Sequence, residues 1–347
     1  MNPRERVLAI LNRQKVDRIP VDIWYTPEIS QILMTHFNVT TDLKLYKAMG
    51  LDKIVWIMPE YTAATPGRTL WGTETRGIDT GTAEYTEMGK PALKGFDTIS
   101  SLDNCPFWPD PAKFDYTKAA DFAKQVSKEY ATLGPWVSFY EIYCQIRGME
   151  QAMIDLVMSP EYAQAVLDRI EEIQTEMMKR LFQSTGDALD MVFLSDDMGS
   201  QGSLLLSPSM WDHFFKDRMK RWCDLIHSYG KKVFYHSDGA VEPLIPRLIE
   251  AGIDILNPIQ HVCPGMEMDS LKAKYGDKLI FHGGVENQKV LPFGTADEVR
   301  AEVRDCLRTL GAGRKGFICS SCHNIQAGTP LENVLAMVET VKKEGAV

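Results

Sequence analysis

Polar residues that could bind a metal or a substrate follow several short apolar runs of this 347-residue chain. Four of its seven histidines lie at such ends, in the segments His236-Ser-Asp238-Gly, Gln260-His261, His282-Gly-Gly and Cys322-His323-Asn. Neutral imidazole and carboxylate together are a common ligand set for zinc and other borderline metals. His236 and Asp238, two residues apart, could therefore turn toward one cation. The alternative is that Asp238 only caps the next helix.

Three carboxylates are candidate catalytic groups. Asp196 and Asp197 follow another apolar run, where they could bind a cation or accept a substrate hydroxyl, or merely cap the following turn. Glu141 also follows an apolar run, and its apolar neighbours predict partial burial. A buried glutamate needs a partner, which could be a metal, a hydroxyl or Arg147.

Further side chains are candidates for substrate contacts or for the pocket wall. A lone Cys319-x-x-Cys322 pair is a weak zinc signal, so we expect Cys319 to be buried and only Cys322 or His323 to face the pocket. His282 could bind an anion or satisfy a backbone carbonyl. The aromatic candidates could equally belong to the core. The candidate substrate-binding residues are Trp24, Tyr25, Trp56, Tyr140, Gln201, Gln260 and His282.

The elements that must position these side chains alternate between short apolar strands and amphipathic helices, which indicates a parallel sheet covered by helices. Helices are predicted over 159–184, 207–228, 240–251, 296–310 and 331–344. Eight strands predict a (β/α)8 TIM barrel with its chemistry at the carboxyl ends of the strands, although an open doubly wound sheet would leave a similar pattern. The predicted strands are 20–25, 52–57, 136–140, 190–195, 232–236, 254–257, 278–282 and 316–319.

Residues 1–347 are predicted to form one domain, because no Ser/Gly-rich linker divides the chain. Residues 60–112 fit no strand–helix unit. Within them, 68–72 and 82–87 resemble the strands of a hairpin, which we expect to be inserted after the second strand, where it could shape the pocket.

Composition limits the possible partners. A formal net charge of −9 argues against nucleic acid, which requires a dense basic face. No apolar stretch is long enough to span a bilayer, and the amino-terminal residues do not form a signal-peptide core. Seven scattered cysteines do not suggest a disulfide framework. These features predict a cytoplasmic protein.

Several segments resemble the uroporphyrinogen decarboxylase superfamily, and more closely its methyltransferase-like and uncharacterised branch than its haem-pathway decarboxylase. The resemblance extends over nearly the whole chain and implies a (β/α)8 barrel and a plausible homodimer. The segment Thr329-Pro-Leu-Glu-Asn-Val334 is the most specific of them. The others are Pro3–Leu8, Asp17–Val21, Ser207–Trp211, Phe234–Gly239, Gly252–Pro258 and Cys322–Ile325.

The family's decarboxylase branch carries Arg-Gln-Ala-Gly-Arg after its first strand, and those arginines hold the carboxylates of the substrate. The corresponding stretch of this chain is Tyr25-Thr-Pro-Glu-Ile29, with neither arginine. An acidic protein without these cations is poorly suited to a substrate with eight carboxylates. The comparison argues against decarboxylation of uroporphyrinogen.

The family's corrinoid methyltransferases bind zinc through His-x-Cys-Gly and a later cysteine. By this resemblance, Asp238 replaces the first cysteine and His323 takes the second position, with Cys322 adjacent. The implied ligands are His236, Asp238 and His323. This set would suit an oxygen-bearing substrate, which the metal would polarise as a Lewis acid.

The expected function is therefore transfer of a methyl group between a small O- or N-methyl compound and a corrinoid protein, assisted by a divalent metal, most simply zinc. The Asp-x-His-x-x-Gly cobalamin signature is absent, so a partner would carry the corrinoid. One alternative is a metal-independent decarboxylase or lyase for a small carboxylated substrate, with Arg147 or Arg68 in the pocket. Another is a non-catalytic ligand-binding barrel.

Overall fold

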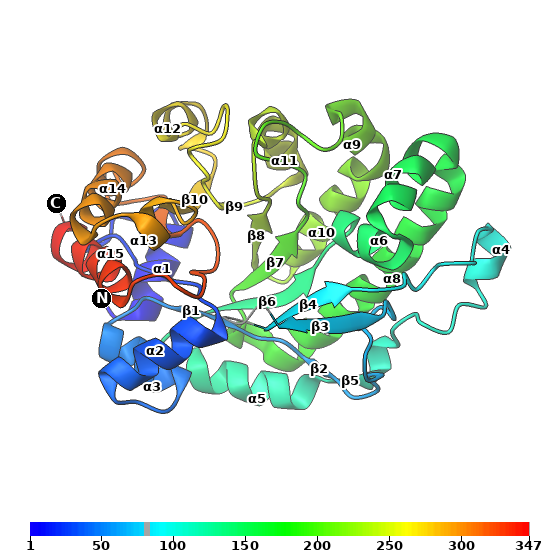
Figure 1. The fold of residues 1–347 in the computed structure, drawn as a ribbon, viewed down its shortest axis with the longest axis horizontal. Helices are drawn as coiled ribbons and strands as arrows, with labels where there is room; N and C mark the ends of the chain where they lie inside the picture. The colour runs from blue at the N-terminus through cyan, green and yellow to red at the C-terminus, as the bar shows by residue number, and fades with distance from the viewer. Residues whose placement is uncertain (80–83, 347) are drawn as a thin grey trace.

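A parallel sheet of seven strands forms the centre of the computed structural model, which describes residues 1–79 and 84–346. The strands follow the order β1-β6-β7-β8-β9-β10-β11 and curl into a half-barrel, as in a TIM-like barrel (Figure 1). Each neighbouring pair is parallel. The strands are β1 (Ile54–Trp56), β6 (Ala131–Val137), β7 (Met191–Ser195), β8 (Lys232–His236), β9 (Ile255–Asn257), β10 (Ile280–Val285) and β11 (Phe317–Ser321).

The predicted first strand, 20–25, is not a regular strand. It forms only isolated bridges, from Val21 to Cys319 and from Tyr25 to Ile325. On its other side, the backbone N–H of Asp52 donates to the carbonyl of Val21. The N–H of Val21 in turn donates to the Asp52 side chain at 2.9 Å, so a carboxylate replaces a backbone partner there. The segment thus lies between β11 and the residues just before β1.

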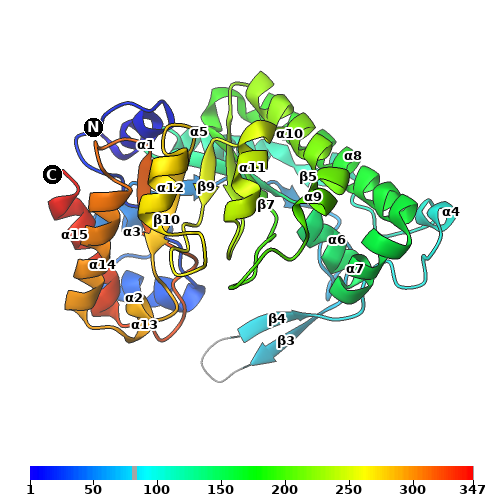
Figure 2. The same ribbon diagram turned by 90° about the horizontal axis from the view of Figure 1, so that it is seen from above.

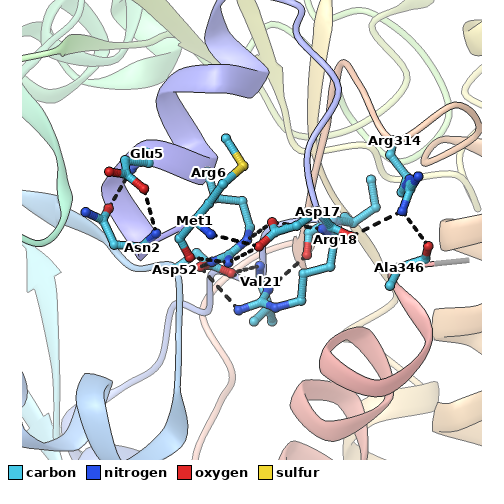
Figure 3. Close-up of polar contacts among 11 residues, drawn as sticks. Met1, Asn2, Glu5, Arg6, Asp17, Arg18, Val21, Asp52, Arg314 and Ala346 are labelled. Carbon is cyan, nitrogen blue, oxygen red and sulfur yellow. Dashed lines mark hydrogen bonds and ion pairs between the residues drawn. The ribbon is translucent and has the colours of Figure 1, made fainter.

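Two arginines help to hold this segment by binding Asp52 (Figure 3). Asp52 is fully buried and accepts hydrogen bonds from Arg6 and from Arg18, the latter at 2.5 Å. Arg6 also binds Asp17 through its Nε, at 2.7 Å. The cluster therefore ties the first helix to the segment 20–25 and to the start of β1.

Helices cover the outside of the sheet, and α1 lies at the end opposite to β3 and β4 (Figure 2). Val7 and Ile10 of α1 pack with inward-facing strand residues such as Ile54 and Phe234, forming a core inside the curled sheet. A second, larger core lies between the strands and the outer helices. No helix of the described residues is both long and apolar enough to cross a membrane. The helices are α1 (Pro3–Leu11), α2 (Pro27–Phe37), α3 (Asp42–Met49), α4 (Ile99–Leu102), α5 (Tyr116–Val126), α6 (Tyr140–Arg147), α7 (Met149–Met158), α8 (Pro160–Thr185), α9 (Pro208–Phe214), α10 (Lys216–Ser228), α11 (Ile245–Ala251), α12 (Met268–Tyr275), α13 (Val290–Phe293), α14 (Ala296–Thr309) and α15 (Leu331–Glu344).

Three predicted elements differ from the structure by more than a few residues or by a break. The helix predicted over 207–228 is divided at Phe215, whose side chain is fully buried and whose backbone has φ −120° and ψ −28°. The helix predicted from residue 240 begins as α11 only at Ile245, after a short 3₁₀ turn. The strand predicted over 136–140 runs instead from Ala131 to Val137, and Tyr140 already begins α6.

The region 60–112 contains β3 (Thr75–Asp79) and β4 (Glu84–Met88), which pair antiparallel and project from the sheet in Figure 2. The prediction of a strand at 68–72 was wrong. Gly72 has φ +82°, and a Cβ there would lie 2.4 Å from the side chain of Phe107, so the chain turns at this point. Residues 82 and 83 of the second predicted strand lie outside the described residues. A further pair, β2 (Glu60–Tyr61) and β5 (Phe114–Asp115), lies nearby. That the region is an insertion stays a prediction.

Candidate functional site

A cavity of about 440 Å³ lies at the carboxyl ends of the strands. Its aromatic wall comes from several strands, and the rings of Trp24, Trp56 and Phe193 touch one another with centroids 4.7–5.9 Å apart. Tyr25, Tyr46 and Trp136 complete this wall, and the polar lining includes Lys53, Glu141, Asp197, His236, His323 and Asn324. An aromatic wall with a few convergent polar groups is the usual character of a small-molecule site.

Three side chains from two different strand ends meet beside this cavity, which His236 and His323 line and Asp238 does not. His236 is the last residue of β8, Asp238 follows two residues later, and His323 comes just after β11. One potential ligand atom from each lies within 4.8 Å of the other two. The three residues that the family resemblance implied as a set are thus close together in space, although far apart along the chain.

The chemistry of this trio fits a cation. Oδ1 of Asp238 is buried and has no hydrogen-bond partner among the residues that the structure describes. Nε2 of His236 lies 4.0 Å from that oxygen and 3.7 Å from Oδ1 of Asp197. Burial raises the pKa of Asp238 and lowers the pKa of His323, because each loses solvation of its charged form. A cation among these atoms would give the unpartnered carboxylate oxygen a charged partner.

The loop that carries Asp238 is held by hydrogen bonds from its backbone N–H groups to side chains of other segments. The N–H of Asp238 donates to Asp197 at 2.9 Å, and the N–H of Gly239 donates to Gln260 at 2.6 Å. Gly239 has φ +87°, and a Cβ there would lie 2.4 Å from the carbonyl oxygen of Ser200. The N-cap residues of the 3₁₀ turn and of α11 are Val241 and Leu244, and Oδ1 of Asp238 accepts no hydrogen bond within the described part of the chain, so Asp238 does not serve as the helix cap considered as an alternative.

Cys322 is placed away from the trio. Its thiol is buried and donates to the carbonyl of Ile259 at 3.2 Å, and burial raises the thiol pKa well above its usual value. Cys319 is fully buried on β11, as expected. The geometry therefore favours His323 over Cys322 as the third ligand.

Glu141 lies in the first turn of α6 and lines the cavity. Burial and the nearby charge of Asp197 raise its pKa to about 7. Ser195 Oγ donates to its Oε1 at 2.5 Å. Arg147 is not its partner, because that guanidinium binds Asp155 and Asp97. Glu141 can therefore gain or lose a proton near neutral pH.

Asp196, also expected at the site, does not line the cavity. It is fully buried and caps α6: Ser138 Oγ donates to it at 2.7 Å and the N–H of Tyr140 at 2.6 Å. Burial raises its pKa to about 7, against the lowering effect of these hydrogen bonds. The capping interpretation is the one the geometry supports, although the capped helix is α6 and not the turn that follows Asp197.

The other predicted substrate contacts divide into two groups. Trp24, Tyr25 and Trp56 line the cavity. Four do not. Tyr140 packs against Phe215, Gln260 holds the loop at Gly239, Gln201 is exposed, and His282 is fully buried between Asn257 and Asp22. The strand-end position of these four suggested the site, but their side chains point elsewhere.

Sequence reasoning missed several lining residues, chiefly Phe193 and Ser195 on β7, Trp136 on β6 and Lys53 before β1. Alternation along the strand could have found the two β7 residues, because every second side chain points to the same face. Lys53 had no such signal. Its Nζ donates at 2.8 Å to Asp22, which lies 31 residues earlier in the sequence.

Comparison with known proteins places this fold in a family. A model described as uroporphyrinogen decarboxylase (URO-D) matches residues 84–344. The chain belongs to the uroporphyrinogen decarboxylase family. A search of curated proteins gave no match.

Among solved structures, this URO-D family member resembles a methyltransferase from Methanosarcina mazei at 18% identity and a TM-score of 0.71, over 99% of both chains. That likeness shows a shared fold. Dispersin B is 11% identical over 96% of this chain and 100% of its own, with a TM-score of 0.42. A psychrophilic xylanase of glycoside hydrolase family 10 is 13% identical over 89% and 87%, with a TM-score of 0.44. Neither of these two bears on function.

The cavity of this URO-D family member contains no arginine among the described residues. Arg147 pairs with Asp155, and Arg68 pairs with Glu74. Lys53, the one lysine that lines the cavity in the described part of the chain, is paired with buried Asp22. Its polar lining is otherwise carboxylate, imidazole, hydroxyl and amide. The site is therefore poorly equipped to hold a carboxylated substrate.

Proposed function

We propose that the protein is a metal-assisted methyltransferase that moves a methyl group between a small O- or N-methyl compound and a corrinoid protein. The observation that carries the proposal is the meeting of His236, Asp238 and His323 beside an aromatic cavity, with one buried carboxylate oxygen unpartnered. Membership of the URO-D family and the shared fold with a methyltransferase support it.

In this proposal the three side chains hold a divalent metal, most simply zinc. When bound, such a metal supplies Lewis-acid polarisation of an oxygen or nitrogen atom of the substrate. The protein's own groups do the rest. The aromatic wall formed by Trp24, Trp56 and Phe193 excludes water and packs against the substrate. Glu141, whose pKa is raised to about 7, gains or loses a proton at the heteroatom that exchanges its methyl group.

The charge of the cavity limits the substrate. Three carboxylates (Glu141, Asp197 and Asp238) lie at or beside it, against one lysine already paired with Asp22. Even with a divalent cation present, the site therefore suits a neutral or cationic methyl compound better than an anionic one. The corrinoid would arrive on a partner protein, because this sequence lacks the Asp-x-His-x-x-Gly cobalamin signature.

The test combines metal analysis with a methyl-transfer assay. The purified protein is expected to hold about one zinc per chain, and His236→Ala and Asp238→Ala to hold much less. With a corrinoid protein and a panel of neutral, cationic and anionic methyl compounds, only the wild type should change the cobalt spectrum, and only with the first two classes. Equal, negligible zinc in wild type and variants would overturn the metal assignment.

A metal-independent lyase for carboxylated substrates gains no support, because neither Arg68 nor Arg147 reaches the cavity. The same assay distinguishes the methyltransferase from the remaining alternative, a non-catalytic ligand-binding barrel. Tight binding of a methyl compound without turnover, even with a corrinoid protein supplied, would identify a non-catalytic binding protein.

A further inference from the structure

A chain of buried hydrogen bonds runs beneath the cavity from Asp22 to His236. Asp22 Oδ2 lies 3.2 Å from His282 Nε2, His282 Nδ1 lies 2.7 Å from Asn257 Nδ2, and Asn257 Oδ1 lies 2.6 Å from His236 Nδ1. Asp22, His282 and Asn257 are fully buried, and His236 is 5% exposed. Solvent is therefore excluded as an alternative partner along the chain.

The far end of this chain is fixed by charge. Lys53 Nζ donates to Asp22 Oδ1 at 2.8 Å, and Trp24 Nε1 donates to Oδ2 at 3.0 Å. Burial by itself would raise the pKa of Asp22, but the Lys53 charge and the hydrogen bond from His282 hold it below its ordinary value. Asp22 is thus a carboxylate, which can only accept hydrogen bonds.

The donor and acceptor of every other hydrogen bond in the chain follow from the carboxylate of Asp22. Burial lowers the pKa of His282, which leaves a neutral ring with one N–H. That N–H must be on Nε2 to donate to Asp22, so Nδ1 accepts from the amide NH₂ of Asn257. The amide oxygen of Asn257 then faces His236 and accepts from its Nδ1–H. The Nε2 lone pair of His236 is left facing the carboxylates of Asp197 and Asp238.

We infer that Asp22 is a positioning residue which, through His282 and Asn257, fixes the tautomer of His236 so that Nε2 is free to bind a cation. The effect of Asp22 on metal affinity rests on the proposed function, whereas its effect on the tautomer of His236 does not depend on whether a metal binds. With the opposite polarity, Nε2 of His236 would carry the proton and an unprotonated nitrogen of His282 would face a carboxylate, an unfavourable contact between two acceptors. Trp24, which covers His282 at a centroid distance of 5.3 Å, shields the chain from the cavity.

The test reads the tautomer directly in metal-free protein by ¹⁵N NMR of labelled histidine, at alkaline pH where imidazole is neutral. Loss of one signal in His236→Gln would assign the His236 resonances. The wild type is expected to show Nδ1–H and an unprotonated Nε2. In Asp22→Asn, a carboxamide can donate to His282, so the chain can reverse and His236 should gain the Nε2–H form.

Two variants of Asn257 provide a second test of the tautomer if the Asp22 variant does not fold. Asn257→Asp keeps an oxygen opposite His236 and should retain the Nδ1–H form, whereas Asn257→Leu should leave the tautomer free to mix. Circular dichroism and thermal melting would establish that both variants are folded. If folded Asn257→Leu kept a pure Nδ1–H form, or the wild type showed Nε2–H, the inference would be overturned.

Metal affinity gives a second readout, by competition with a chelator. Asp22→Asn and Asn257→Leu should bind zinc about 10–100-fold more weakly than the wild type, the usual effect of losing a residue that orients a metal-binding histidine. Asn257→Asp should bind no more weakly than the wild type. Absence of zinc binding in all four proteins would contradict the metal site of the proposed function, while the NMR result would still decide the tautomer.

Discussion

The backbone N–H of Glu141 donates to the carboxylate of Asp196 at 3.2 Å. The residue that lines the cavity is thus joined to the buried residue that caps its helix. Asp196 also accepts from Ser138 Oγ and from the N–H groups of Phe139 and Tyr140. One carboxylate therefore fixes the start of α6 and, with it, the position of Glu141.

Replacing Asp196 by alanine should destabilise the fold. The change leaves several buried N–H and O–H donors without an acceptor, and we expect a loss of about 2–4 kcal/mol in the free energy of unfolding. Urea denaturation monitored by circular dichroism would measure it. Asp197→Ala is the matched control, because that side chain is 43% exposed and accepts one backbone N–H, from Asp238. Similar losses in the two variants would contradict the capping role.

Glu141→Gln should change how stability depends on pH in the metal-free protein. The folded-state pKa of Glu141, about 7, lies above its ordinary value of 4.5, so the folded protein binds the proton more tightly than the unfolded chain does. The contribution of Glu141 to stability is therefore greatest below pH 4.5 and is lost as pH rises toward 7.

Relative to the wild type, Glu141→Gln should thus gain stability between pH 4.5 and 7.5, on the order of 1–3 kcal/mol. Urea denaturation at several pH values would measure the difference. Ser195→Ala removes the hydrogen bond to Glu141 but keeps the carboxyl group, so its pH dependence should remain. A constant difference between wild type and Glu141→Gln across this range would show that the pKa is not raised.

The sequence predicted those elements of the fold whose pattern of apolar and polar residues matches the way they pack in the structure. Six strands of the sheet were found because each is a short apolar run between helical segments, whereas the strand predicted over 136–140 overlaps β6 only at its last two residues. Residues 20–25 were misassigned as a strand because the N–H of Val21 binds the Asp52 side chain, a partner 31 residues away that no local pattern reveals.

For the candidate site, the sequence indicated a region of the fold more reliably than the individual side chains. Strand-end position suggested His236 and Asp238, the family resemblance implied His323, and the structure brings the three side chains together. Asp196 and His282 share that place, but their side chains turn inward to Tyr140 and Asn257. Strand-end position identifies the edge of the sheet, whereas the direction of a side chain depends on hydrogen-bond partners from distant segments.

The choice between the adjacent residues Cys322 and His323 can be tested by metal content. His323→Ala should lose most of the zinc, because it removes one of the three proposed ligands, while Cys322→Ala should keep it, because that thiol donates to Ile259. Elemental analysis after dialysis against a weak chelator would measure both. Loss of zinc from folded Cys322→Ala, with retention in His323→Ala, would reverse the assignment.

The cluster around Asp52 should contribute strongly to stability, although it lies away from the cavity. Asp52→Ala leaves Arg6, which is 6% exposed, without a buried partner and removes the acceptor of the Val21 N–H (Figure 3). We expect a loss of about 3–5 kcal/mol in the free energy of unfolding, the usual effect of breaking a buried ion pair on one side. Urea denaturation would measure this loss.

Asp17→Ala is the matched control for that change, because Asp17 binds the same arginine but its side chain is 44% exposed. Solvent can replace much of its interaction, so its loss should be about 1 kcal/mol or less. The two variants should also differ in hydrogen exchange: only Asp52→Ala should speed exchange of the Val21 and Asp22 amides, which join the segment 20–25 to Asp52 and to β11. Equal protection of these amides in both variants would mean that the segment is held by packing alone.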